Sequence, residues 1–315
     1  MAPLITGIHH ITAIAGNAQN NVDFYTGILG LRLVKKTINF DAPDVYHLYY
    51  GDEVGSPGSI LTFFPFEGAR RGIKGTGELT YTAFSIPTNS MDYWIDRLAK
   101  FGIATSTPLQ RFGDTYIRFE DHDGLGIELV AAAKDSRKGW SYGNIPQEHA
   151  ILGFYGATLN LRSKDLTAKL LTELMDYKFI AEDNNRFRYG TKGEPGDIID
   201  IVVDEGRPGT QSAGTVHHIA FRTENDKTQA AIQKKLMENG VQVTEVKDRN
   251  YFKSVYYREP GGVLFEIATD EPGFAIDEEE AHLGEALKLP DWVEPQRAKI
   301  ESRLPKLELN PNKYE

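Results

Sequence analysis

The segments RFGDTYIRFEDHDGLGIEL (residues 111–129) and RNYFKSVYYREPGGVLFEI (residues 249–267) determine how this chain divides into structural units. With a constant offset of 138 residues, three pairs coincide in residue type: Arg111 with Arg249, Gly124 with Gly262, and Glu128 with Glu266. Each segment follows an amphipathic helical pattern, and each helical pattern follows a strand pattern. This recurring order indicates a repeated supersecondary unit of one strand, one helix and about three further strands.

The same unit occurs twice more in the chain. GIHHITAIA (residues 7–15) and FYGATLNLRS (residues 154–163) are each followed by a helical pattern and then by three strand patterns. Four βαβββ modules therefore begin near residues 7, 79, 153 and 215. The sequence predicts an α+β fold in which the four modules form two tandem domains, followed by a different, acidic segment with one helix near its end.

Composition limits the function classes that need to be considered. The formal net charge of −10 disfavours a nucleic-acid partner, which usually requires a basic surface. No apolar run approaches the ~20 residues of a membrane span, and the N-terminus lacks the features of a signal peptide, so we expect a cytoplasmic protein without a membrane partner. The absence of cysteine leaves histidine and carboxylate side chains as the main candidate metal ligands.

Two pairs of adjacent histidines lie in the first strands of modules one and four, at residues 9–10 and 217–218. Because neighbouring side chains of a strand point to opposite faces, at most one histidine of each pair can face a common point. The apolar alternation around each pair selects His10 and His218. Only module four completes such a histidine with a carboxylate in its last strand, Glu266.

The corresponding positions of the other modules lack this combination. The constant offset places Thr80 and Glu128 at these positions in module two, whereas module one has Thr62 in its last strand. Module three has no first-strand histidine, and its last-strand position falls at Asp200 or Ile201. A single strand histidine is more often a hydrogen-bonded core residue than a ligand, but the coincidence of repeat position, alternation and carboxylate favours a metal site.

Modules one and four together supply two imidazoles and one carboxylate. That ligand set is the facial triad of non-haem Fe(II) oxygenases, which leaves coordination positions open for substrate and O₂. We therefore predict that His10, His218 and Glu266 bind Fe(II), with Mn²⁺ as an alternative ion. We expect structural or solvated roles for the other histidines, namely His47, His122, His149 and His282.

The two histidine-containing regions also resemble a known family. GIHHITAIAGNAQNNVDFYTGILGLRLVKKTINFD and TVHHIAFR together with GVLFEIATDEPGF are similar to ring-cleaving dioxygenases of the vicinal-oxygen-chelate (glyoxalase/bleomycin-resistance) superfamily, especially those acting on hydroquinone and chlorohydroquinone. The resemblance implies two glyoxalase-like domains, 4–145 and 150–272, each an open, cup-shaped mixed β-barrel, with a tail over 273–315. It also implies the same three metal ligands.

The resemblance further implies catalytic or substrate-contacting roles close to the metal, for His9, Thr12, His217, Arg249 and Tyr256. Thr12 shares the face of His10, in agreement with strand alternation. His9 and His217 would face the other way in a regular strand, so a site role for them requires a bulge or strong twist. Arg111 has no histidine close to it in the repeat and is expected to be structural.

The expected activity is Fe(II)-dependent cleavage of a small, hydroquinone-like aromatic ring by O₂. One alternative is a glyoxalase-type isomerase or lyase on another metal, which usually needs a carboxylate at the position of Thr62. Another is a protein that sequesters a small hydrophobic molecule, which needs no metal trio. A homo-oligomer is compatible with the sequence, which does not define the oligomeric state.

Overall fold

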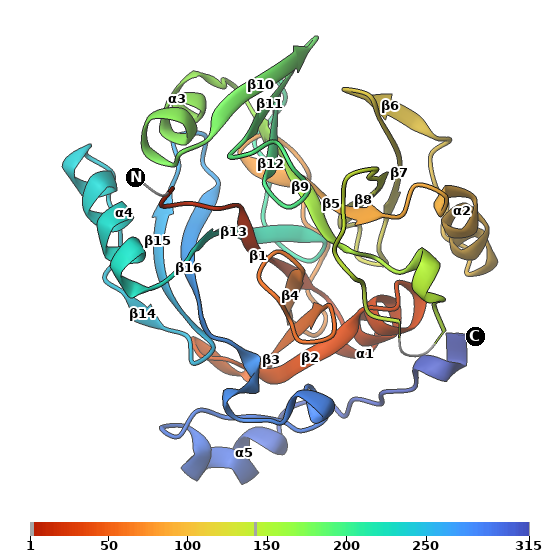
Figure 1. Cartoon of the computed structure of the whole chain (residues 1–315). Helices are drawn as coiled ribbons and strands as arrows, with labels where there is room; N and C mark the ends of the chain where they lie inside the picture. Colours follow the sequence, from red (N-terminus) through yellow and green to blue (C-terminus); the bar gives the residue numbers. More distant parts are fainter. Residues whose placement is uncertain (1–2, 142–143, 315) are drawn as a thin grey trace.

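The computed structural model describes residues 3–141 and 144–314. Its architecture is two curved, eight-stranded mixed sheets that meet along one side, with helices packed on their outer faces (Figure 1). This confirms the predicted α+β fold. The four modules begin at β1, β5, β9 and β13, within one residue of the positions that the repeat predicts.

The first sheet combines modules four and one. Its strands, in spatial order, are β14 (Lys247–Asp248), β15 (Phe252–Arg258), β16 (Leu264–Pro272), β13 (Thr215–Thr223), β1 (Ile8–Ala15), β4 (Ile60–Pro65), β3 (Ala42–Gly51) and β2 (Arg32–Asn39). The first strand of each module pairs in parallel with the last strand of the same module, and β1 pairs with β13 in antiparallel orientation. The first sheet is thus two copies of one strand order, joined at their first strands.

The second sheet has the same plan and combines modules three and two. Its strands, in spatial order, are β10 (Lys178–Asp183), β11 (Arg186–Gly190), β12 (Ile198–Val203), β9 (Gly153–Leu161), β5 (Glu78–Ile86), β8 (Gly126–Ala131), β7 (Asp114–Glu120) and β6 (Leu109–Arg111). Here β5 and β9 form the antiparallel junction. Each sheet therefore takes one module from each half of the sequence, whereas the boundaries 4–145, 150–272 and 273–315 remain a prediction.

Helices pack on the outer faces of the sheets, except for the last one, which lies in the tail after β16 (Figure 1). They are α1 (Ala18–Val22), which continues as the π-helix Asp23–Ile28, α2 (Met91–Lys100), α3 (Asp165–Lys169), which continues as the π-helix Leu170–Leu174, α4 (Asp226–Glu238) and α5 (Arg297–Glu301). Short 3₁₀ turns occupy Gln147–His149, Phe274–Ile276, Glu280–His282, Glu294–Gln296 and Pro311–Tyr314. A capping box begins α4, because the Asn225 side chain accepts from the backbone N–H of Thr228, and Thr228 reciprocates.

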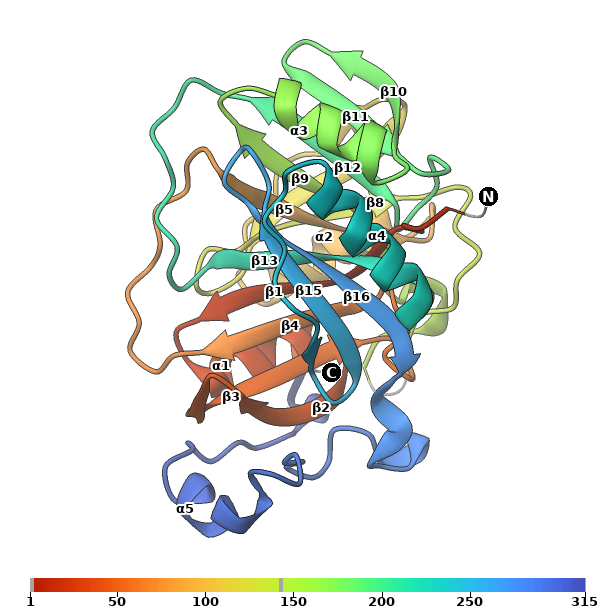
Figure 2. The same cartoon turned by 90° about the vertical axis from the view of Figure 1, so that its left-hand side faces the viewer.

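The tail after β16 is held against the edge of the first sheet (Figure 2). Lys35 of β2 is fully buried, and its ammonium group lies 2.6 Å from Asp277 and also contacts Glu278. The backbone of Lys36 accepts a hydrogen bond from Lys288. A buried ammonium group needs such partners, because an unpaired charge in the interior is strongly destabilising. The tail thus covers the exposed edge of β2.

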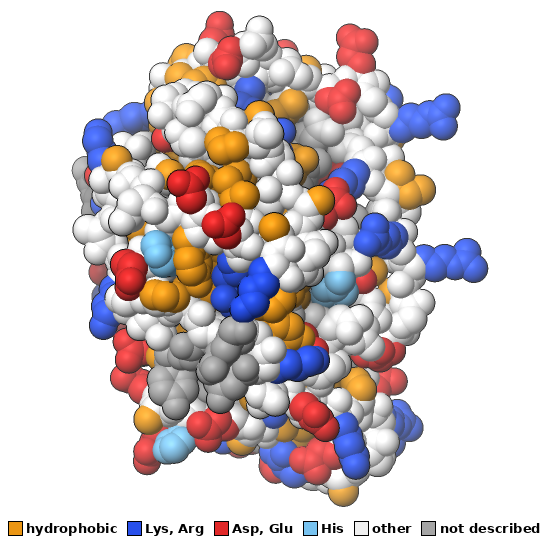
Figure 3. Space-filling view, turned by 90° about the vertical axis from the view of Figure 1, so that its right-hand side faces the viewer, with side chains coloured by type: hydrophobic (Ala, Val, Ile, Leu, Met, Phe, Trp, Pro, Cys, Tyr) orange, Lys and Arg blue, Asp and Glu red, His pale blue; other side chains and the backbone are white. Residues whose placement is uncertain are grey.

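The surface carries charges of both signs despite the negative balance of the chain. Figure 3 shows one face, on which acidic and basic side chains are interspersed among apolar ones. In the part of the chain that the structure describes, no helix has the length and apolar character needed to cross a bilayer.

The second sheet encloses a buried ion-pair network. Arg111 binds both carboxylate oxygens of Glu128, at 3.0 and 2.7 Å, and Arg118 donates to the same carboxylate at 2.8 Å. Arg186 and Arg188 bind Asp200 in a related arrangement. These contacts agree with the expected structural role of Arg111, since the buried carboxylates of Glu128 and Asp200 are each compensated by guanidinium groups.

This network generates a stability prediction. Arg111→Ala leaves the fully buried Glu128 with only the partly exposed Arg118, so we expect a loss of about 3 kcal/mol in the free energy of unfolding, measured by urea denaturation. Arg303→Ala, at an exposed tail position, should change it by less than about 0.5 kcal/mol. Equal effects of the two substitutions would contradict a structural role for the network.

Candidate metal centre

The junction of β1 with β13 contains a bulge on each strand. His9 is the extra residue between Ile8 and His10, which face Phe221 and Ala220 on β13, and His217 is the extra residue between Val216 and His218. A bulge shifts the alternation of side chains, so the first histidine of each pair does not simply point to the opposite face. Thr12 lies directly opposite His218, which places His10 and His218 on the same side of the sheet.

His10, His218 and Glu266 converge in the interior of this sheet. The Nε2 atoms of the two histidines are 3.3 Å apart, and Oε2 of Glu266 lies 3.4 Å from His10 Nε2 and 2.9 Å from His218 Nε2. All three side chains are buried. Among the described residues, they form the single group of three such side chains close enough to hold a metal ion.

The spacing of these atoms suits a bound cation. Neighbouring ligands at about 2.1 Å from an octahedral ion are about 3.0 Å apart, close to the observed separations. The Oε2 atom of Glu266 is also buried without a hydrogen-bond partner among the described residues. Its other oxygen accepts a hydrogen bond from Ser254, which fixes the orientation of the carboxylate. The residues therefore fit a divalent metal ion.

The electrostatics of the trio match the protonation states that a metal requires. Burial disfavours the charged form of Glu266, yet the charges of His10 and His218 hold its pKa well below the usual value. Burial lowers the pKa of His218, and the neighbouring Glu266 only partly opposes this shift. An ionised carboxylate beside an imidazole whose neutral form is favoured, that of His218, can bind a cation with little proton release.

The adjacent histidines explain why each ligand belongs to a pair. His9 Nδ1 is hydrogen-bonded to His10 Nδ1 at 2.9 Å, and His217 Nδ1 to His218 Nδ1 at 2.7 Å. In both pairs this bond leaves Nε2 of the second histidine directed at the trio. Contacts of this kind fix the tautomer and orientation of a metal-binding imidazole. The bulges thus make each first histidine a support for the second.

A cavity of about 520 Å³ opens beside the trio. Its walls are rich in aromatic side chains, and Phe252 packs against the His10 ring with centroids 4.8 Å apart. Three of the residues implied by the resemblance line it: His217, Arg249 and Tyr256. Arg249 Nε donates to the Tyr256 hydroxyl at 3.1 Å, so these two side chains form one polar wall.

The other two residues implied by the resemblance lie behind the cavity wall. Thr12 is fully buried and accepts a hydrogen bond from Thr62 at 2.9 Å, whereas His9 is buried behind His10. Neither contributes to the lining of the cavity. Their positions favour support of the ligands over direct contact with a substrate.

His47 lines the cavity, although the sequence suggested a solvated strand surface. Its Nε2 is hydrogen-bonded to Thr62 and its Nδ1 to Tyr49, both at 2.8 Å. The equivalence of this position with one in module four becomes visible only in the strand register. Tyr49 pairs with Thr62 as Tyr256 pairs with Glu266, so His47 corresponds to Ser254 two residues before Tyr256.

The second sheet shows why one site and not two is formed. Its register places Asp200, not Ile201, at the last-strand position of module three. It also places Tyr81, not Thr80, at the position of His218, because Thr80 is itself the extra residue of a bulge. The second sheet has no imidazoles at these positions, and arginines bind Glu128 and Asp200. It therefore has ion pairs where the first sheet has the trio.

The geometry predicts one divalent ion per chain. His10→Ala, His218→Ala and Glu266→Gln should each abolish stoichiometric binding of Fe(II) loaded under anaerobic conditions, measured by elemental analysis, since each removes one ligand. His9→Phe should weaken binding by about 10–100-fold through loss of the support to His10. His282→Ala, which removes an exposed tail histidine, is the matched control, and a loss of metal there equal to that in His10→Ala would contradict the assignment.

Comparisons with known proteins identify relatives of this chain. The chain is 46% identical over 304 residues to "Putative ring-cleaving dioxygenase MhqO" of Bacillus subtilis (strain 168), covering 96% of this chain and 97% of that protein. It is 36% identical over 301 residues to "Chlorohydroquinone/hydroquinone 1,2-dioxygenase" of Sphingobium indicum (strain DSM 16413 / CCM 7287 / MTCC 6362 / UT26 / NBRC 101211 / UT26S), covering 92% and 93%.

Solved structures share the fold. A crystal structure of a "putative dioxygenase" from Bacillus subtilis subsp. subtilis str. 168 has a TM-score of 0.95 at 45% identity, covering 98% of this chain and 99% of that one. Glyoxalase I from Zea mays, at 15% identity, has a TM-score of 0.63 and covers 84% and 92%. Residues 7–129 and 148–267 match one family profile. The chain belongs to the Glyoxalase/Bleomycin resistance protein/Dioxygenase superfamily.

Proposed function

We propose that this enzyme is an Fe(II)-dependent dioxygenase that uses O₂ to cleave the ring of hydroquinone-like substrates, including substituted or chlorinated ones. The observation that carries the proposal is the convergence of His10, His218 and Glu266 beside an aromatic-lined cavity. Two histidines and one carboxylate are the ligand set of non-haem Fe(II) oxygenases. The names of the relatives, ring-cleaving dioxygenase and hydroquinone dioxygenase, support the same reaction class.

The proposed reaction is a ring-opening dioxygenation. One ring C–C bond of the hydroquinone breaks, both atoms of O₂ enter the product, and the product is an acyclic carboxylic acid. Fe(II) bound by the trio would supply electron transfer to O₂ and would ease loss of the phenolic proton. The remaining requirements are binding of the ring, exclusion of water and placement of protons, which belong to the cavity walls.

The aromatic walls provide a slot for a flat ring. Phe252 packs against His10, and Phe64 packs against His47 with centroids 4.3 Å apart. Apolar and aromatic surfaces of this kind bury a substrate ring and exclude bulk water from the reacting atoms. The slot therefore holds a substrate ring beside the open side of the trio.

The polar wall of the cavity can stabilise negative charge that develops during the reaction. Arg249 and Tyr256 supply hydrogen-bond donors to a substrate oxygen or to the ring-opened acid. Arg249 is also 3.6 Å from Asp41 at the mouth of the cavity, which holds the guanidinium in place. His217 lines the same cavity. Its Nδ1 is bonded to His218, which leaves Nε2 for proton transfer.

His47 is the second proton-transfer candidate. Desolvation in the cavity wall, reinforced by His10 and His218, holds its pKa well below the usual value, so the ring is neutral at neutral pH. Both of its nitrogens are bonded to hydroxyl groups, which can rotate and free a nitrogen for a phenolic proton. This assigns His47 a role that the sequence alone did not suggest.

Oxygen uptake tests the proposed reaction. After anaerobic loading with Fe(II), the wild-type protein should consume O₂ in equimolar amount with hydroquinone, and a parallel reaction with catechol should be slower. His10→Ala should reduce uptake to background, while the His282→Ala control should retain it. Absence of uptake with either aromatic, in protein that holds iron, would overturn the proposal.

Substitution of His47 tests the proton-transfer role. His47→Phe keeps an aromatic ring but removes both nitrogens, so we expect kcat for hydroquinone to fall by about 100-fold while iron content is retained. Tyr49→Phe removes only one hydrogen bond to His47 and should have a smaller effect. Unchanged kcat in His47→Phe, at full iron occupancy, would limit His47 to a structural role.

A further inference from the structure

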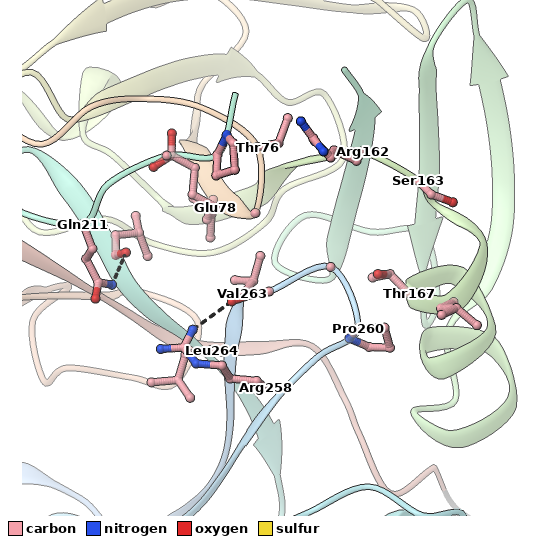
Figure 4. A pocket seen from close by; sticks show the side chains of 18 of the residues that line it. Thr76, Glu78, Arg162, Ser163, Thr167, Gln211, Arg258, Pro260, Val263 and Leu264 are labelled. Carbon is pink, nitrogen blue, oxygen red and sulfur yellow. Dashed lines mark hydrogen bonds between the residues drawn. The ribbon is translucent and has the colours of Figure 1, made fainter. Parts of the chain in front are cut away.

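A second cavity, of about 550 Å³, adjoins the metal cavity where the two sheets meet (Figure 4). The two cavities share three lining residues, His217, Gln211 and Leu264. Gln211 is tied to the start of β13, because its amide donates to the carbonyls of Val216 and His217 at 2.9 and 3.1 Å. His217, Gln211 and Leu264 thus lie at the boundary between the metal cavity and this second cavity, which we call the outer chamber.

Two arginines line this chamber from different sheets. Arg162 follows from the last residue of β9, and Arg258 ends β15, on separate walls of the chamber (Figure 4). Each uses one donor on a backbone carbonyl, Arg162 with Gly206 at 3.3 Å and Arg258 with Gly262 at 2.8 Å. Among the described residues, no carboxylate forms an ion pair with either guanidinium group.

The acidic groups of the chamber wall are already engaged. Glu78 accepts a hydrogen bond from the backbone of Gly75 at 2.7 Å. Glu259, behind the wall, is buried and accepts from Thr167 and from the backbone of Gly261 and Val263. The two arginines therefore face the chamber with donors to spare, and the lining itself has two guanidinium groups against the single carboxylate of Glu78.

The rest of the wall combines apolar side chains, from leucine, valine and proline residues, with the uncharged polar side chains of Thr76, Ser163, Thr167 and Gln211. A chamber with such mixed walls and guanidinium groups on separate sides suits a short organic chain with anionic ends. Arginine matches the planar geometry of a carboxylate, which it can bind through two parallel N–H donors.

We propose that this second cavity is a binding site for small organic carboxylates, with Arg162 and Arg258 as its anion-binding residues. The origin of the carboxylate rests on the proposed function, because ring cleavage would create a carboxylate in the metal cavity, which adjoins the chamber. A carboxylate substituent on an aromatic substrate would present the same chemistry. In either case, the chamber holds the anionic group while the metal cavity holds the reacting ring or its remnant.

The test is equilibrium binding of muconate, an acyclic dicarboxylate, measured by titration calorimetry without O₂ or turnover. Wild type should bind muconate, and Arg258→Gln and Arg162→Gln should each weaken binding by about tenfold or more, as expected for loss of a charge-assisted contact. Arg303→Gln, which removes the same charge from the exposed tail, is the matched control and should bind as wild type does. His10→Ala should retain binding, because the chamber does not depend on the metal.

Several results would overturn the proposal. These are no muconate binding, equal binding in the two chamber variants and in Arg303→Gln, and loss of binding in His10→Ala alone, which would place muconate on the metal. Displacement of muconate by inorganic phosphate at equal concentration would identify an unselective anion site and would also overturn it. Because no step of this test requires turnover, failure here leaves the dioxygenase proposal standing, and the reverse also holds.

Two kinetic measurements distinguish the two sources of the carboxylate, the ring-opened product and a carboxylated substrate. Inhibition of hydroquinone turnover by muconate, relieved in Arg258→Gln, would identify the ring-opened product. A KM for 2,5-dihydroxybenzoate that rises in Arg258→Gln more than the KM for hydroquinone would identify a carboxylated substrate. Absence of both effects, despite muconate binding, would overturn a role of the chamber in the reaction.

Discussion

In the β1–β13 pair, Thr12 lies opposite His218 and His10 lies opposite Ala220, so two histidines 208 positions apart in the sequence share one face of a sheet. Every other feature of the metal site depends on this antiparallel junction. The position of Glu266 relative to His10 depends on it, because β16 pairs in parallel with β13 and places the carboxylate beside Ala220, the residue opposite His10. The histidine pairs follow as well, since the bulges of the junction turn His9 and His217 into hydrogen-bonded supports.

The second sheet repeats the same scaffold with different chemistry in its interior. Where the first sheet brings a carboxylate to two imidazoles, the second surrounds Glu128 and Asp200 with four arginines. A buried carboxylate needs a compensating positive charge in either case. In the second sheet the protein provides that charge itself. In the first, no guanidinium or ammonium group among the described residues pairs with Glu266, and its Oε2 lies beside two imidazoles in a position suited to a cation.

Much of this arrangement could be predicted from the sequence because the fold is repetitive. The offset of 138 residues located equivalent strands, and strand alternation then selected His10 and His218 without knowledge of the tertiary structure. The same offset misaligned module two by one residue in its first strand. Thr80 and His217 are the equivalent extra residues of the bulges in β5 and β13, so His218 corresponds to Tyr81 and not to Thr80. Module four is therefore one residue longer than module two between its first and last strands, which a constant offset cannot represent.

Other features depend on contacts between distant segments and have no local pattern. His47 looks like an ordinary strand residue until β3 is paired with β4 and its ring is directed at Thr62. Nothing in the local sequence marks Lys35 as buried, and only the folded tail brings Asp277 and Glu278 to its ammonium group. The outer chamber with Arg162 and Arg258 forms where the two sheets meet, which the order of modules along the chain does not define.

Location of the bound metal tests the central claim most directly. In crystals of protein loaded with Fe(II) or Mn²⁺, anomalous diffraction at the metal absorption edge should give one strong peak, about 2.1 Å from His10 Nε2, His218 Nε2 and a carboxylate oxygen of Glu266. Such a peak would establish that modules one and four form the metal centre across the β1–β13 junction. A peak elsewhere in the molecule, or none in protein that contains the metal, would contradict it.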